Sequence, residues 1–233
     1  MLELLSLDAI RIILALAMLG IACASDIKKR EISDYIWIIF GAIAAILIPF
    51  SGDLSNILIK IGIAMIIAPI VLIIWRVGLF GGADAFALIV LAGLAPSATF
   101  THSVLTPFTT LTNTVLLSIV PMLVNITRNA ILLAKKQDIF EGFDETRGRK
   151  ILAMFIGYRA ANPKFGFSIE QKQGKRKRLN LSIQHAEYAE FCDKKDTWIT
   201  PGIPYMIFIL AGFVIQLIYG DIIFGAFSFS NPT

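Results

Sequence analysis

Residues 57–80 read ILIKIGIAMIIAPIVLIIWRVGLF, and this stretch decides the fold class. It contains two charged side chains, Lys60 and Arg76, in a run longer than the roughly 20 helical residues that cross a hydrocarbon core. Pro69 is tolerable inside such a span because neighbouring helices satisfy the backbone groups that it frees. The chain as a whole has 56% hydrophobic and 16% charged residues, whereas soluble domains average about 25% charged. The sequence therefore predicts a membrane protein.

Five further apolar segments accompany this one. They cover residues 10–24, 35–50, 85–98, 115–134 and 203–223. The first of them is preceded by no basic region and followed by no small-residue cleavage box, so we expect a retained span and not a removable signal peptide. The sequence thus predicts a mainly α polytopic membrane protein with six transmembrane helices.

Basic residues in the loops indicate the orientation, because cytoplasmic loops are enriched in Lys and Arg. Three basic residues at 28–30 follow the first span, and most of the others lie between the fifth and sixth spans. The segments 51–55 and 99–113 contain none. We therefore expect a multi-pass protein of the cell membrane with both termini outside. Arg11 and Lys60 fall on the wrong side, and long side chains of this kind can snorkel to the interface.

The polar segment 135–200 is predicted to form a small cytoplasmic α/β domain. Apolar residues alternate with polar ones on both sides of a basic stretch that contains Gly174: Phe165, Phe167 and Ile169 before it, and Leu179, Leu181 and Ile183 after it. Period-two alternation around a glycine-bearing turn predicts a β-hairpin. The expected domains are residues 1–134 with five transmembrane helices, 135–200 with the cytoplasmic domain, and 201–233 with the sixth helix and an outer C-terminus.

Two acidic residues, Asp26 and Asp84, are the candidates for a shared site. Asp26 ends the first predicted span and Asp84 begins the fourth, so the expected topology places both at the cytoplasmic surface. Asp8, Asp53 and Asp221 fall on the opposite side. An ionisable group beside a span is costly to hold there and is therefore a functional candidate.

The local surroundings favour function at both positions. Asp84 opens a helix, where a capping residue is also common, but the preceding Gly81, Gly82 and Ala83 allow another backbone or an extended peptide to approach closely. We expect these three residues to bind substrate. Asp26 stands at a helix C-terminus, where the macrodipole disfavours a carboxylate.

A pair of carboxylates in one site matches the chemistry of hydrolysis. Two carboxyl groups in contact do not both ionise readily, so one keeps a proton. The ionised group takes a proton from water while the protonated group hydrogen-bonds the scissile carbonyl oxygen. No metal or cofactor is expected, and His102 and His185 show no metal-ligand spacing. Helix-end effects favour Asp84 as the ionised partner and Asp26 as the proton carrier.

Four motifs resemble those of a known family. The stretch SDIKKREI at 25–32 resembles the first aspartate motif of the type IV prepilin peptidase superfamily. GGAD at 81–84 resembles its GxGD motif, with alanine in the third position. MFIGYR at 154–159 and WITPGIPY at 198–205 are similar to archaeal preflagellin (prearchaellin) peptidases. The resemblance covers nearly the whole chain.

This resemblance implies an aspartic endopeptidase that removes the short basic leader of preflagellins, next to a glycine, at the cytoplasmic membrane surface. Asp26 and Asp84 would be the catalytic residues. The partners implied are leader peptides and membrane lipid, with no nucleic acid. Bacterial members also methylate the new N-terminus and often carry a cysteine-rich region, and the lack of a cysteine cluster here implies peptidase activity alone. An acidic patch is either a binding surface for the basic leader or a solvated helix face: Asp138, Glu141, Asp144 and Glu145.

Other protein classes also carry carboxylates beside membrane spans. A presenilin-like intramembrane protease is one alternative. That class would have a tyrosine before the aspartate and a Pro-Ala-Leu motif, whereas Asp26 follows a serine and the sequence contains no clear Pro-Ala-Leu motif. A proton-coupled transporter is another, but it would hold its carboxylates at mid-membrane between broken helices, whereas these lie at span ends. The third alternative is a non-catalytic assembly subunit.

Overall fold

The computed structural model describes residues 6–98, 106–173, 176–182 and 189–223. The chain folds as two compact units. Residues 1–117 together with 204–233 form the first, which we call the helical unit, and residues 118–203 form the second, which we call the mixed unit. Gly174, Ile183, His102 and His185, which carried parts of the sequence predictions, lie outside the described residues.

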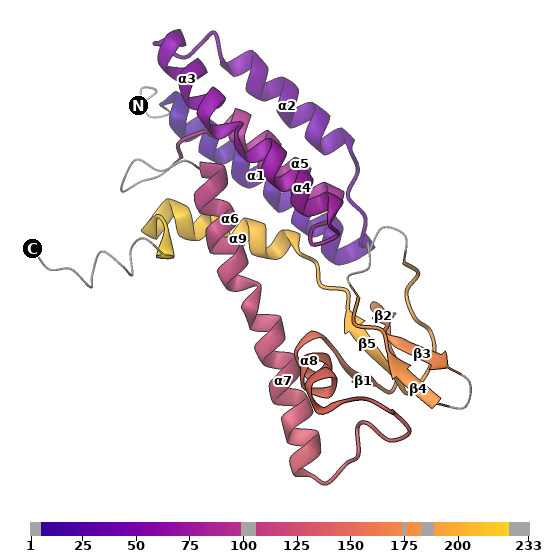
Figure 1. Ribbon diagram of the computed structural model, residues 1–233. Helices are drawn as coiled ribbons and strands as arrows, with labels where there is room; N and C mark the ends of the chain where they lie inside the picture. Colours follow the sequence, from indigo (N-terminus) through magenta and orange to yellow (C-terminus); the bar gives the residue numbers. More distant parts are fainter. Residues whose placement is uncertain (1–5, 99–105, 174–175, 183–188, 224–233) are drawn as a thin grey trace, which may run out of the picture. The chain divides into compact units, whose positions relative to one another are not determined.

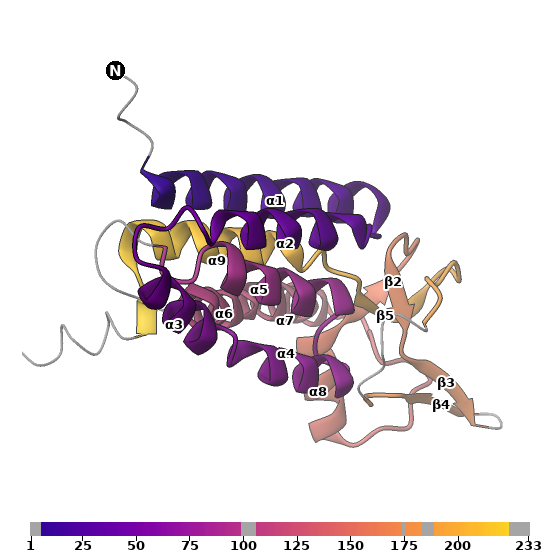
Figure 2. The same ribbon diagram turned by 90° about the horizontal axis from the view of Figure 1, so that it is seen from above.

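The helical unit packs around one central helix. Its elements are α1 (Leu7–Lys29), α2 (Tyr35–Leu47), α3 (Leu54–Ala64), α4 (Ile67–Arg76), α5 (Gly82–Leu94), α6 (Thr106–Leu117) and α9 (Met206–Tyr219). Helix α5 contacts α1, α2, α3, α4 and α6, and its Ala87, Leu88 and Leu91 side chains are fully buried. Figure 2 shows α1 lying along α2, and α1 also contacts α9. Small and branched apolar residues on α5 thus lie in the core, to which α1, α2, α4 and α9 also contribute buried side chains.

Six apolar helical stretches coincide with the six predicted spans. Within the part of the chain that the structure describes, three are long and apolar enough to cross a membrane: Leu7–Lys29, Leu54–Arg76 and Thr106–Ala134. The other three, α2, α5 and α9, have 13, 13 and 14 residues, fewer than the roughly 20 of a full crossing. The protein is therefore mostly helical with three candidate spans, and the count of six remains a prediction.

Two of the long stretches are interrupted shortly before an internal proline, and in each case the next helix begins two residues before that proline. Helix α3 ends at Ala64 and α4 begins at Ile67, which brackets the position four residues before Pro69. Helix α6 ends at Leu117, four residues before Pro121, and α7 begins at Ile119. A proline ring clashes with the carbonyl group four residues earlier and removes one hydrogen bond. The two breaks therefore follow from the sequence.

The fifth apolar stretch begins earlier than predicted. Residues 99–113 were expected to be an outer loop, but α6 starts at Thr106. Its polar residues lower the hydropathy of this segment, so a hydropathy pattern does not detect it. Their hydrogen-bonding groups find partners on or next to α9. Thr110 Oγ1 lies 2.6 Å from Gln216 Oε1, and Asn113 Nδ2 donates to the Gly220 carbonyl at 3.0 Å. Polar side chains here join two helices, as they commonly do inside membrane bundles.

The mixed unit contains two small antiparallel sheets beside two helices (Figure 1). Its elements are α7 (Ile119–Ala134), α8 (Arg147–Ile156), β1 (Tyr158–Ala160), β2 (Gly166–Ser168), β3 (Glu170–Gln173), β4 (Arg176–Leu179) and β5 (Thr197–Pro201). Strand β5 lies between β1 and β2, and β3 pairs with β4. Trp198 of β5 is fully buried and stacks on Phe140, with ring centroids 4.8 Å apart. Its indole N–H donates a hydrogen bond to the Ile139 carbonyl at 2.8 Å.

The predicted hairpin is present, but its strands are shifted. The ladder pairs Glu170 with Leu179 and Gln173 with Arg176, so it runs through the basic stretch that was predicted to be the turn. Of the apolar residues before it, Phe167 belongs to another sheet, because it is opposite Thr200 of β5. Alternation identifies strands but carries no information about a partner some 30 residues away.

Arg11 does not snorkel, contrary to the sequence prediction. Its side chain is 2% exposed. The guanidinium donates to the carbonyls of Gly93, Leu94 and Leu47, at 3.4, 2.9 and 3.3 Å. The last carbonyls of a helix have no intrahelical partner and carry partial negative charge, so a buried arginine is stabilised between the C-terminal ends of α2 and α5.

Candidate active site

Asp26 and Asp84 lie at the same end of the helical unit. Arg11, in the first part of α1, reaches Leu94 at the C-terminus of α5. The two helices are in contact and therefore run antiparallel. Asp26, in the last turns of α1, and Asp84, in the first turn of α5, consequently lie at the opposite end from Arg11.

Asp26 is half-buried and contacts the start of α9. Its Oδ2 accepts a hydrogen bond from the backbone N–H of Met206, at 3.3 Å. Met206 is the first residue of α9, and the first N–H groups of a helix have no partner within it. The positive end of α9 thus faces a carboxylate that stands at the negative end of α1. Helix ends therefore do not distinguish Asp26 from Asp84, and the assignment of the proton to Asp26 stays a prediction.

Asp84 is held by the turn that precedes it. The side chain is 8% exposed, and its Oδ2 accepts a hydrogen bond from the backbone N–H of Gly81 at 3.1 Å. This is the carboxylate half of a capping box, since glycine has no side chain to complete it. A Cβ atom at Gly81 would lie 3.2 Å from Asp84 Oδ2. Gly81 therefore allows the close approach of this carboxylate, and its expected role in binding substrate stays a prediction.

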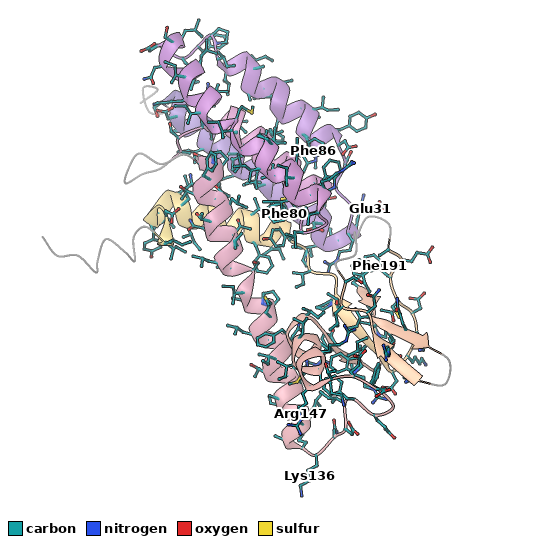
Figure 3. The ribbon with its side chains drawn as sticks, viewed as in Figure 1. Glu31, Phe80, Phe86, Lys136, Arg147 and Phe191 are labelled. Carbon is teal, nitrogen blue, oxygen red and sulfur yellow. The ribbon has the colours of Figure 1, made fainter. Side chains whose placement is uncertain are left out.

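Aromatic rings also join the start of α9 to the segment that precedes Asp84. Phe80, which precedes Gly81, packs against Tyr205, which precedes Met206, with ring centroids 5.2 Å apart. Figure 3 shows Phe80 beside the N-terminal part of α9. The start of α9 thus contacts both Asp26 and the segment that precedes Asp84. Sequence reasoning singled out residues 198–205 as a motif but missed this contact, because the group that binds Asp26 is a backbone amide.

The predicted acidic patch is only partly available to a ligand. Glu145 accepts a hydrogen bond from the Leu179 N–H at 2.7 Å and pairs with Arg149 at 2.6 Å, and its side chain is 4% exposed. Burial alone would raise the pKa of Glu145, but these two hydrogen bonds and nearby positive charge lower it below its usual value. Asp138, Glu141 and Asp144 are exposed. Glu145 is therefore part of the folded structure of the mixed unit.

Comparisons with known proteins cover most of the chain. Residues 13–126, which contain both aspartates, match the type IV leader peptidase family, and residues 125–222 match the archaeal peptidase A24 C-terminus, type II. The chain is 26% identical to the preflagellin peptidase of Methanocaldococcus jannaschii over 231 residues, covering 89% of this chain and 92% of the relative. It is 28% identical to that of Methanococcus maripaludis over 214 residues, covering 86% and 91%, and 28% identical to that of Methanococcus voltae over 224 residues, covering 89% and 94%. The chain therefore carries a type IV leader peptidase domain followed by an archaeal peptidase A24 C-terminal domain.

Proposed function

We propose that the protein is a multi-pass aspartic endopeptidase of the cell membrane that removes the short basic leader of preflagellins. Cleavage takes place next to a glycine, at the cytoplasmic membrane surface, with both termini of the enzyme outside. The observation that carries the proposal is that Asp26 and Asp84 share one end of the helical unit. The similarity to three preflagellin peptidases supports the choice of substrate.

The proposed chemistry uses the two carboxyl groups as acid and base. The ionised carboxylate takes a proton from water as the water oxygen attacks the scissile carbonyl carbon. The protonated carboxyl donates a hydrogen bond and then its proton to the carbonyl oxygen, which gives a neutral tetrahedral intermediate. Collapse of this intermediate breaks the C–N bond. The leaving amine takes the proton from the first carboxyl, and the second carboxylate takes back a proton from a hydroxyl group of the intermediate as the product carboxyl forms. The pair then holds one proton again.

Substrate would enter along the backbone of the turn before Asp84. Gly81, Gly82 and Ala83 are only partly exposed, and the small side chains leave their backbone accessible to an extended peptide. The basic leader would stay in water while the apolar helix that follows it stays in lipid. The cleaved bond would then lie at the boundary, which is the depth expected for helix ends.

Cleavage of a preflagellin by the purified protein in detergent tests this proposal. Asp26→Asn and Asp84→Asn are expected to abolish cleavage while melting like wild type. Asp8→Asn is the matched control, because Asp8 lies in the first turn of α1, at the far end from Asp26. Cleavage by both asparagine variants would refute the aspartate mechanism.

Mass spectrometry of the products then locates the cleaved bond. A cut next to the glycine at the leader–helix boundary agrees with the proposal. A cut inside the apolar helix would instead favour a presenilin-like protease.

A further inference from the structure

We propose that Phe80 and Tyr205 are positioning residues that jointly align Asp26 and Asp84 through two backbone amides. The proposal rests on the catalytic role proposed above for the two aspartates. It assigns a task to the start of α9, which the sequence marked as a motif but to which no function was attached.

The same arrangement occurs on both sides of the site. Phe80 directly precedes Gly81, whose N–H donates to Asp84 Oδ2 at 3.1 Å. Tyr205 directly precedes Met206, whose N–H donates to Asp26 Oδ2 at 3.3 Å. In each case an aromatic residue is followed by the amide that binds an aspartate.

The two rings hold each other. Their centroids are 5.2 Å apart with an angle of 48° between the ring planes, within the range of favourable tilted aromatic pairs. Tyr205 also packs against Phe208 in the first turn of α9, with ring centroids 5.7 Å apart and an angle of 60° between the ring planes. Both Phe80 and Tyr205 pack against the buried core of the helical unit. The ring of Tyr205 is thus held by the segment before α5 and by its own helix.

A ring that is held in place also fixes the amide that follows it. The peptide group is planar, so only the ψ angle of the aromatic residue separates its Cα from the orientation of the next N–H. The bond from Met206 to Asp26 is already long, since typical N–H···O distances are about 2.9–3.0 Å. A small rotation at Tyr205 is therefore enough to break it.

The remainder of α9 is fixed independently by α6. A Cβ at Gly212 would lie 2.6 Å from Thr114 Oγ1, which shows how closely the two helices approach. Gln216 is fully buried, and its Oε1 accepts a hydrogen bond from Thr110 Oγ1 of α6 at 2.6 Å. Loss of the ring contact is therefore expected to act on the first turn of α9 and to leave the packing of the helix in place.

Cleavage kinetics of single and double variants test the proposal. Tyr205→Ala and Phe80→Ala should each lower kcat about 10- to 100-fold, as misplaced catalytic groups do, while KM changes less than about two-fold. Residues that act through one contact are not additive. The double variant is therefore expected to be no slower than the slower single variant.

Three further variants separate positioning from general stability. Tyr205→Phe and Phe80→Tyr keep the rings and should keep most of the wild-type kcat. Trp75→Ala is the control, since Trp75 forms a similar ring pair with Phe86 at 6.1 Å but does not adjoin an amide that binds an aspartate. It should lower the melting temperature comparably and leave kcat near wild type.

Several outcomes would overturn the proposal. Wild-type kcat in both alanine variants would do so, as would multiplicative losses in the double variant, a loss in Tyr205→Phe as large as in Tyr205→Ala, or an equal loss in Trp75→Ala. If Asp26→Asn and Asp84→Asn are inactive in the same assay, the proposed function still stands. If those two are active, both proposals fail.

Discussion

The Arg11 guanidinium donates a hydrogen bond to the Leu94 carbonyl at 2.9 Å and so joins the beginning of α1 to the end of α5. A further bond to the Leu47 carbonyl, at 3.3 Å, adds the end of α2. This contact at one end of the helical unit sets the antiparallel arrangement that brings Asp26 and Asp84 to the other end. A buried cation far from the candidate site thus takes part in its geometry.

Replacing Arg11 with methionine is expected to destabilise the protein by about 1–3 kcal/mol, because it leaves buried carbonyl oxygens without donors. Methionine retains much of the side-chain length and removes the charge. Thermal unfolding in detergent measures the effect. Lys60→Met is the control, since Lys60 is exposed and should change the melting temperature little. Equal melting temperatures of the two variants would mean that the Arg11 hydrogen bonds make no net contribution to the free energy of unfolding.

Gly212→Ala should destabilise the protein by about 1–3 kcal/mol, the usual cost of overpacking. The added Cβ would lie 2.9 Å from the Thr110 carbonyl oxygen and closer still to Thr114 Oγ1. Gly41 in α2 offers the comparison, because a Cβ there meets nothing within 4 Å. Gly41→Ala should be neutral or slightly stabilising, as expected for a glycine inside a helix. If Gly212→Ala melts at or above the temperature of Gly41→Ala, α6 and α9 are not in close contact.

Gly81→Ala is expected to lower the rate of leader cleavage about 10-fold with little loss of stability. Its Cβ would press on Asp84 Oδ2 at 3.2 Å and displace that carboxylate by a few tenths of an ångström, and misplaced catalytic groups lose rate steeply. Gly62→Ala in α3, where the space is open, is the matched substitution and should cleave normally. Wild-type activity in Gly81→Ala would show that the close approach is not needed for catalysis.

Glu145→Gln should destabilise the mixed unit at neutral pH and progressively less in acid. The pKa of Glu145 is lowered in the folded state, because hydrogen bonds from Leu179 and Arg149 outweigh the effect of burial. Its ionised form therefore contributes stability above the unfolded pKa of about 4.3, and this contribution is lost as the pH falls through the lower folded pKa.

Urea unfolding at several pH values measures the difference, which is expected to be about 1–3 kcal/mol near pH 7. Glu141→Gln serves as the reference, since Glu141 is exposed. A gap between wild type and Glu145→Gln that stayed constant down to pH 3 would contradict the assigned cause.

Local features of the chain were predictable because they depend on neighbouring residues. The apolar runs, the breaks before Pro69 and Pro121, and the candidate residues Asp26 and Asp84 all follow from periodicity, from proline geometry or from the cost of a charge beside lipid. The beginning of α6 was missed for the opposite reason. Thr110 and Asn113 are polar on a hydropathy scale, and only their partners on α9 make them compatible with a buried helix.

The helical, membrane-embedded character of the chain, its two candidate aspartates and its family resemblance could be predicted because each depends on residue type and spacing. Three contacts became known from the folded chain: Arg11 binds helix ends, β2 pairs with β5, and Met206 contacts Asp26. The partners in these contacts are backbone groups or residues distant along the chain. Every residue except proline carries the same backbone N–H and C=O groups, so no pattern of side chains can name which of them will bind.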